Sequence, residues 1–266
     1  MISGLFAKKL STWALFFLMF MLSMESYSQE LKNMHPSLGA LVSLSTKAEK
    51  EFSQQQRNCD SLRAKVSSQE AYEKLSIPDK KIYDKCEESP ASYWDIIGVG
   101  CSWYCGGGLD TISASSFLKP NMEISYSAGN IHDLSYKTAW IEGVSGYGIG
   151  ESITYHFPPE NPRITELIIV NGLVKSEQAW NDNARVKKLK MYLNNKPYAI
   201  LNLFDSRQSQ HFKLESPLGY SDRDNWSKLQ AKPWWTIRFE IIDVYKGNKY
   251  DDTAITEIYF DGIDVH

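Results

Sequence analysis

The chain has 266 residues, with 29 lysines and arginines against 32 aspartates and glutamates, which gives a formal net charge of −3. Nucleic-acid-binding proteins normally carry a basic face, so this slightly acidic balance argues against that class. The 8 tryptophans and 15 tyrosines favour an exported protein rich in β-strands, and the length suits one main core with a smaller additional element.

The N-terminus has the pattern of a secretory signal peptide over residues 1–28. Lys8 and Lys9 precede an apolar run over residues 10–24, and small residues follow it. We predict cleavage before Gln29, which makes the mature protein secreted, periplasmic or held at the cell surface, and not integral to the membrane. The alternative is an uncleaved anchor helix, but the run is shorter than the roughly 18–20 apolar residues that span a bilayer.

Residues 29–92 are predicted to form a helical segment. Apolar residues recur near helical spacing through residues 38–75, and Ser76 with Pro78 marks the start of a second helix over residues 79–87. The sequence shows no ligand site here. We therefore expect a spacer, a cap on the following domain, or a surface that binds a protein of the cell envelope.

All four cysteines lie in the first half of the predicted mature chain. An even number in an exported protein indicates two disulfides, and four cysteines allow three connectivities. We favour Cys59–Cys86, which would join the two helices and contribute about 3 kcal/mol by constraining the unfolded chain. We also favour Cys101–Cys105, which would hold the aromatic pair between them outward in a tight loop. A zinc site lacks CxxC spacing, and a catalytic thiol lacks a neighbouring histidine.

Residues 93–109 are predicted to be a linker rich in glycine and aromatic residues, and beyond it apolar residues alternate with period two. Strands are predicted over residues 111–118, 151–157, 164–170, 185–193, 198–204, 234–244 and 254–260. Turn formers such as Asn194-Asn195 and Ser216-Pro217 separate the strands. This pattern predicts a mostly β domain over residues 110–266, built as a two-sheet jelly-roll sandwich.

Residues 126–151 stand out within this domain, because they combine several glycines with Trp140 and three tyrosines. Glycine permits a backbone with positive φ, so the stretch predicts a shaped loop between strands. An aromatic loop of this kind is typical of a rim that binds a flat, polar ligand. The alternative is a structural corner of the sandwich, with Trp140 as its core anchor.

Several motifs follow one another in residues 110–262. They are Ala-Ser-Ser at 114–116, Thr-Ala-Trp-Ile-Glu-Gly at 138–143, Gly-Ile-Gly-Glu at 148–151, Asn-Gly at 171–172 with Lys175, Asn183 with Arg185, and the stretch 243–255. Their order resembles one branch of the discoidin, or coagulation factor V/VIII type C, superfamily. The branch is named after the translocation domain of a streptococcal NAD glycohydrolase and is also described as an NADase-type glycan-binding domain. The resemblance implies a galactose-binding-like jelly roll that binds a sugar through loops at one end. It does not imply NAD cleavage, which in that family belongs to a separate domain.

Sugar recognition needs a flat aromatic ring against the apolar face of a pyranose and planar polar groups that bracket its hydroxyls. Residues at the predicted strand ends supply both. The predicted ligand-binding residues are Trp140, Glu142, Asn171, Lys175, Asn183, Arg185, Tyr250, Asp251 and Asp252, with Tyr147 and Trp180 as further aromatic candidates. The alternative is that Glu142, Arg185 and Asp252 form a buried salt-bridge network that holds the loops.

The resemblance also implies one structural calcium ion near the first loop and the last strand. Asp133, Thr138 and Glu257 match the residues that hold it in discoidin-like domains, whereas Ser135 stands in place of a second aspartate. Calcium prefers several oxygen ligands, and backbone carbonyls could supply the remaining ones.

An enzyme is the alternative of a different class. Asp251 and Asp252 are adjacent, and neighbouring strand residues point to opposite faces, so this pair is poorly placed for acid–base catalysis. The sequence shows no Ser-His-Asp order, no metal-binding histidine pair and no phosphate-binding loop. We therefore predict a non-catalytic protein that binds a glycan or glycoconjugate, with a protein-interaction module of the cell envelope as the second alternative.

Overall fold

The computed structural model describes residues 31–41, 44–98, 100, 102–109, 111–121 and 124–265. The predicted signal peptide over residues 1–28 lies outside these described residues. The strands are β1 Lys32–Met34, β2 Ser37–Leu41, β3 Thr111–Ala114, β4 Trp140–Ile141, β5 Ser152–Phe157, β6 Arg163–Asn171, β7 Ala184–Leu193, β8 Lys196–Asn202, β9 Gln208–Leu218, β10 Trp235–Tyr245 and β11 Thr253–Ile263. The α-helices are α2 Thr46–Arg63, α3 Gln69–Glu73, α4 Ile77–Glu87, α5 Glu177–Asp182 and α6 Trp226–Gln230, with two 3₁₀ turns, η1 Trp103–Cys105 and η2 Ala128–Ile131.

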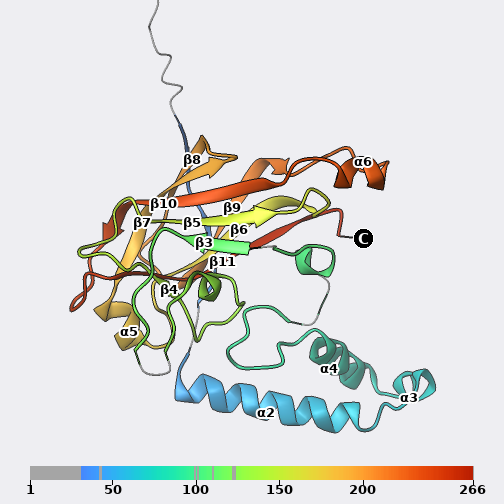
Figure 1. The fold of residues 1–266 in the computed structure, drawn as a ribbon. Coiled ribbons are helices and arrows are strands. Elements are labelled where there is room, and N and C mark those ends of the chain that lie inside the picture. Colours follow the sequence, from blue (N-terminus) through green and yellow to red (C-terminus); the bar gives the residue numbers. More distant parts are fainter. Residues whose placement is uncertain are drawn as a thin grey trace, which may run out of the picture. The chain divides into compact units, whose positions relative to one another are not determined.

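The strands form a jelly-roll sandwich, as predicted (Figure 1). The hydrogen-bonded order is β2-β9-β6-β11-β7-β10-β5-β3, and β8 and β1 extend the second layer beyond β7. Strand β11 joins the two layers, because it runs antiparallel to β6 over most of its length and pairs in parallel with β7 at Thr253 and Ala254. The loops over residues 143–151 and 246–252 leave the sandwich at that junction.

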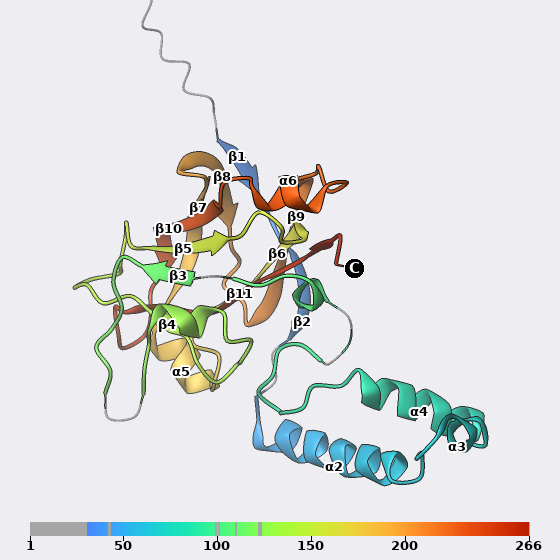
Figure 2. The same cartoon turned by 45° about the vertical axis from the view of Figure 1, so that its right-hand side comes forward.

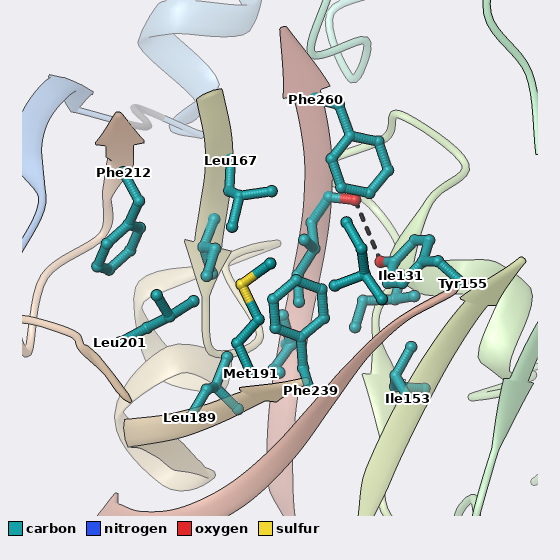
Figure 3. Packing of buried hydrophobic residues seen from close by; sticks show 14 of the residues in the cluster. Ile131, Ile153, Tyr155, Leu167, Leu189, Met191, Leu201, Phe212, Phe239 and Phe260 are labelled. Carbon is teal, nitrogen blue, oxygen red and sulfur yellow. Dashed lines mark hydrogen bonds between the residues drawn. The ribbon is translucent and has the colours of Figure 1, made fainter. Parts of the chain in front are cut away.

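Alternation of apolar and polar residues builds the core between the layers. In β5, Ile153, Tyr155 and Phe157 are buried and their neighbours are half-buried. Burial of each such side chain stabilises the folded state by roughly 1.5–3 kcal/mol. Figure 3 shows the packing, in which the buried hydroxyl of Tyr155 donates to the carbonyl of Ile258 at 3.2 Å.

Strand β9 was not predicted, and the proposed turn at Ser216-Pro217 lies inside it. Its pattern is weak because the buried positions include Gln210, whose amide bonds both the N–H and the carbonyl of Phe204 at 2.8 and 2.9 Å. The Asn194-Asn195 turn is confirmed, since both residues adopt the positive φ that a tight hairpin requires.

Residues 32–41 form two strands instead of part of a helical segment, so this part of the prediction is wrong. Strand β1 pairs with β8 and strand β2 pairs with β9, which adds an edge strand to each layer of the sandwich (Figure 2). A Cβ at Gly39 would lie 2.3 Å from the hydroxyl of Ser209, so glycine allows the close approach of β2. The first helix starts later, where the Ser45 side chain accepts the N–H of Ala48.

The predicted disulfide between Cys59 and Cys86 is confirmed, and it joins α2 to α4. These two cysteines are the residues that α2 and α4 bury, so the crosslink takes the place of a core. Ser76 caps α4 as predicted, because its side chain accepts the N–H of Asp79. Within the described residues, no helix is long and apolar enough to span a bilayer.

The segment predicted as a linker over residues 93–109 contributes to the sandwich core. Trp103 is completely buried, donates its indole N–H to the carbonyl of Pro162 at 3.0 Å and packs against Phe157 and Phe260. The hydroxyl of Tyr104 accepts the N–H of Phe260. The aromatic pair therefore points inward, contrary to prediction. Cys101 lies outside the described residues, so the Cys101–Cys105 pairing stays a prediction.

Candidate functional site

Two loops at one end of the sandwich form the candidate site, and we call them the rim: residues 143–151 and residues 246–252. Buried groups at the start of β11 hold the loops together. The hydroxyl of Thr253 donates to the carbonyl of Tyr147 at 2.8 Å. Glu142, which is fully buried, accepts the N–H of Thr253 at 3.1 Å and the N–H of Val144 at 2.9 Å. One carboxylate therefore fixes both loops.

The loop 246–252 is held on its other side by the C-terminus of α5. The N–H groups of Lys249 and Tyr250 donate to the carbonyl of Asp182 at 3.1 and 2.8 Å. A Cβ at Gly247 would lie 2.5 Å from the backbone of Asp182, so only glycine fits this close approach. The loop thus has a defined backbone before any ligand arrives.

The exposed part of the rim combines an aromatic ring with charged side chains. Tyr250 is 43% exposed, Asp251 is exposed, and Asp252 and Tyr147 are half-buried. Burial raises the pKa of Asp252, and the charge of Asp251 raises it further. Lys175, which lies in the connection between β6 and α5, is half-buried.

Two lysines that were not predicted lie over the rim tyrosines. The ammonium group of Lys246 is 5.4 Å from the ring centroid of Tyr147, and that of Lys249 is 4.8 Å from the ring centroid of Tyr250. The stretch Lys-Gly-Asn-Lys-Tyr-Asp-Asp at 246–252 contained the signal, because it places two lysines within four residues of an exposed tyrosine.

Other predicted ligand residues are buried beneath the rim. Trp140 is 1% exposed and donates its indole N–H to the carbonyl of Ser116 at 2.9 Å, so its ring presents no face to solvent. The amide of Asn171 bonds both the N–H and the carbonyl of Val186 at 3.0 and 2.7 Å. Asn183 donates to the carbonyl of Ala179 at the end of α5. In this structure, all three side chains hold backbone segments in place.

Arg185 contacts several segments around the rim. Its guanidinium forms two hydrogen bonds with Asp205 at 3.0 and 2.9 Å and lies 4.3 Å from the ring centroid of Trp180. It also donates to the carbonyls of Asn183 and Lys246 at 3.0 and 3.3 Å. The sequence allowed two roles for Arg185, ligand binding or a salt bridge that holds the loops. The structure shows a salt bridge, but its partner is Asp205, which the sequence did not indicate.

The other two members of the supposed salt-bridge network repel each other. Burial raises the pKa of Glu142, and the nearby charges of Asp252 and Glu151 raise it further. Among the described residues, Arg185 forms its ion pair with Asp205 and with neither Glu142 nor Asp252, so the predicted network is wrong. The loops are held instead by the backbone hydrogen bonds of Glu142 and by the Arg185–Asp205 pair.

The predicted calcium residues meet at a corner below the rim. The hydroxyl of Thr138 donates to Asp133 at 2.6 Å, and the N–H of Ser135 lies 3.2 Å from Asp133 and 3.3 Å from Glu257. Glu257 is fully buried, and its Oε1 atom has no hydrogen-bond partner among the described residues. Burial raises the pKa of Glu257 well above its usual range, and the charge of Asp133 raises it further.

The nearest basic group does not neutralise this corner. His132 lies 3.8 Å from Glu257 Oε1, but burial lowers its pKa to about 4, so the imidazole is neutral near pH 7. Two adjacent carboxylates with an unpartnered oxygen fit a bound cation. The described residues contain no group of three or more histidine, cysteine, aspartate or glutamate side chains placed to hold a metal, so carbonyl oxygens would have to complete the shell.

Comparison with known proteins gives one family and several distant structures. The sequence model of the NAD glycohydrolase translocation F5/8 type C domain matches residues 103–261, more than half of the chain. Curated protein sequences give no match.

The similar solved structures share little sequence with this chain. The family 32 carbohydrate-binding module from Streptococcus pneumoniae EndoD is 9% identical, with a TM-score of 0.40, over 58% of this chain and 98% of that chain. CpGH89CBM32-5 from Clostridium perfringens, in complex with GalNAc-β-1,3-galactose, is 15% identical, with a TM-score of 0.39, over 57% and 94%. The CBM32-1 and CBM32-2 domains of Clostridium perfringens ZmpB are 10% identical, with a TM-score of 0.39, over 58% of this chain and only 34% of theirs.

Proposed function

This chain belongs to the family of NAD glycohydrolase translocation F5/8 type C domains, and we propose that it is an exported, non-catalytic protein that binds carbohydrate through the rim. One observation carries the proposal: the loop 246–252 is fixed by hydrogen bonds to α5 and presents the half-exposed ring of Tyr250 beside two carboxylates. A loop that is ordered before binding loses little conformational entropy when it meets a ligand.

The chemistry of the exposed rim suits a sugar. The ring of Tyr250 can lie against the apolar face of a pyranose, an arrangement that contributes about 0.5–1.5 kcal/mol beyond the buried area. Asp251 and Asp252 offer planar acceptors for hydroxyl groups, and Lys175 and Lys249 offer donors. Tyr147, half-buried on the facing loop, can add a second ring.

The buried members of the predicted set have a positioning role in this proposal. Trp140, Glu142, Asn171, Asn183 and Arg185 fix the loops through hydrogen bonds to backbone groups. They affect binding by keeping Tyr250 and its neighbours in place. Both oxygens of Glu142 are occupied by N–H groups, which also supports a non-catalytic role for this carboxylate.

We propose in addition that the corner holds one structural calcium ion. Asp133 and Glu257 would supply carboxylate oxygens, Thr138 a hydroxyl oxygen, and nearby carbonyls the rest. The unpartnered oxygen of Glu257 beside the carboxylate of Asp133 supports this proposal. When bound, the ion would neutralise the buried carboxylates and stabilise the corner that leads into the rim.

A second candidate function concerns the disulfide-linked helices, as a surface for a protein of the cell envelope. Ile77 is 85% exposed and Ile82 is 47% exposed, both on α4. A stapled pair of short helices that leaves large apolar side chains in water favours contact with another protein.

A glycan array tests the main proposal. The mature chain from Gln29 is used, because β1 and β2 belong to the sandwich. We expect Tyr250→Ala to reduce retention roughly tenfold without a change in melting temperature. Tyr83→Ala, on the helices, is the control and should behave as the wild type. Wild-type protein that binds no glycan, or Tyr250→Ala protein that binds as well as the wild type, would disprove rim recognition.

A further inference from the structure

The connection between β9 and β10, residues 219–234, lies at the opposite end of β10 from the rim. The rim loop 246–252 follows the last residue of β10, whereas α6 and Trp234 precede its first. Eleven strand residues at about 3.3 Å each separate the two ends by roughly 35 Å. Figure 1 shows α6 and α5 at opposite sides of the sandwich.

Two large aromatic side chains on this connection are more than half exposed: Trp226 at 55% and Trp234 at 53%. Tryptophan is highly buried on average in folded proteins, so two on one connection require an explanation. Among the other described tryptophans, Trp103, Trp140 and Trp235 are at most 3% exposed, and Trp94 and Trp180 are half-buried.

The connection has other anchors besides these two rings. The connection is anchored by Leu229, which is fully buried, and by Trp235, which stacks on Phe157 at 4.3 Å between ring centroids. Asn225 caps α6 by accepting the N–H of Lys228, and the hydroxyl of Tyr220 donates to the carbonyl of Pro233. More than half of each Trp226 and Trp234 side chain therefore remains available for contact with a ligand.

The charges around the two tryptophans are balanced. Lys232 lies 3.7 Å from Asp222, and the guanidinium of Arg223 donates to the carbonyls of Glu160 and Asn161. Residues 219–234 contain three basic and two acidic side chains, which is too little excess charge to attract phosphate groups strongly. A neutral ligand with flat apolar faces and many hydroxyls fits this surface better than a nucleic acid or an anionic bilayer.

We infer that Trp226 and Trp234 form a second carbohydrate-contacting surface, separate from the rim. The inference extends the proposed function to another site, but it stands on residues that the rim does not share. At a separation of roughly 35 Å, the two surfaces cannot hold neighbouring sugars of one short oligosaccharide. The protein would then hold two glycan chains at once, and binding to dense glycans would gain by multivalency.

The experiment compares three forms of the mature protein: wild type, Tyr250→Ala, and the double variant Trp226→Ala/Trp234→Ala. Each is applied to a glycan array and to glycan-coated beads, and thermal melting verifies folding. We expect the double variant to lose roughly tenfold in retention and to stop crosslinking beads, with an unchanged melting temperature. The double variant Trp226→Tyr/Trp234→Tyr, which keeps aromatic faces, should retain most of the binding, and Lys228→Ala on the same helix should behave as the wild type.

The outcomes separate the two sites. Loss of binding in the tryptophan variant alone would support this inference and disprove the rim. Loss in Tyr250→Ala alone, with beads still crosslinked by the tryptophan variant, would overturn the inference and leave the rim intact. Binding to vesicles of phosphatidylglycerol and phosphatidylcholine that is lost in the tryptophan variant, without any change on glycans, would assign these side chains to a lipid surface and overturn the inference.

Discussion

Two groups of residues make up the predicted ligand-binding set, and they differ in how much of each side chain reaches solvent. Trp140, Glu142, Asn171 and Arg185 are at most 7% exposed, and each bonds backbone groups of another segment. Tyr250 is 43% exposed and lies on a loop whose backbone those residues help to fix. The family motifs therefore mark a region of the sandwich in which most of the motif side chains are buried and hold backbone segments in place.

The same difference explains where polar residues are found in the core. A buried polar side chain is costly unless its hydrogen bonds are satisfied, and the amide of Asn171 meets this condition on both of its atoms. The exposed carboxylate of Asp251 has no such requirement and is available for a partner outside the protein. Substitutions in the two groups should consequently change different quantities.

Trp140→Ala should have the largest effect on stability. The ring is 1% exposed and belongs to the main core, so its removal leaves a cavity and an unpaired carbonyl at Ser116. We expect a loss of about 3–5 kcal/mol in the free energy of unfolding. Urea denaturation measures it, with Tyr250→Ala as the exposed control. A Trp140→Ala protein of normal stability that fails to bind glycans would move Trp140 into the exposed group.

Bound calcium should stabilise the folded protein by an amount comparable to the loss expected for Trp140→Ala. If Asp133 and Glu257 hold the ion, saturating it at about 100 times its dissociation constant adds about 2.7 kcal/mol to the free energy of unfolding. Melting curves with calcium and with a chelator measure this increment, and Glu257→Gln should abolish it. Asp251→Asn, in the exposed rim, should leave it intact. Identical wild-type curves with and without calcium would leave a neutral, protonated Glu257 as the explanation of the corner.

Much of the fold could be predicted because one face of most strands is buried. Alternation located β5 and β7 to within a residue, and the even number of cysteines in a predicted exported chain led to the Cys59–Cys86 bridge. Strand β2 was missed because it is short and lies at an edge, and its apolar residues continue into the helical spacing of α2. Such strands form through pairing with distant residues, here Gln208 to His211 of β9, which leaves no local pattern.

The site was less predictable than the fold for a related reason. The sequence identified side chains whose chemistry suits ligand binding. Whether each of these side chains is exposed depends on contacts between segments far apart in the chain. Arg185 pairs with Asp205 across 20 positions, and Trp103 enters the core from a glycine-rich stretch without periodicity. The sequence alone contains no signal that separates Arg185, which is buried, from Lys246, which is exposed.

The Arg185–Asp205 pair offers a smaller and more specific test within the buried group. Arg185→Lys keeps the charge but loses the two-atom contact with Asp205 and the donors to the carbonyls of Asn183 and Lys246. We expect a loss of about 2 kcal/mol, because each lost hydrogen bond costs about 0.5–1.5 kcal/mol. Asp205→Asn should cost about 1 kcal/mol, since Asp205 is the more exposed partner, at 38%. Equal losses would show that the ion pair alone matters.

Glu142→Gln replaces one acceptor oxygen by an NH₂ group, so we expect this exchange to cost about 0.5–1.5 kcal/mol at every pH, and we expect a specific effect in the pH dependence. Burial raises the pKa of Glu142, and Asp252 and Glu151 raise it further, so the folded protein holds the proton more tightly than the unfolded chain. The contribution of Glu142 to stability is then fully present below its ordinary pKa of about 4.3 and is lost as the pH rises through the folded value. Glutamine has no charge to desolvate, so the stability of the variant relative to wild type should increase across that window, by at most roughly 1.4 kcal/mol for each pH unit. Urea denaturation between pH 4 and pH 8, roughly the window in which buried carboxylates titrate, measures the difference. Asp251→Asn removes an exposed carboxylate from the same pair of loops, and its difference from wild type should stay flat; a flat difference for Glu142→Gln as well would place Glu142 in the solvent-exposed group.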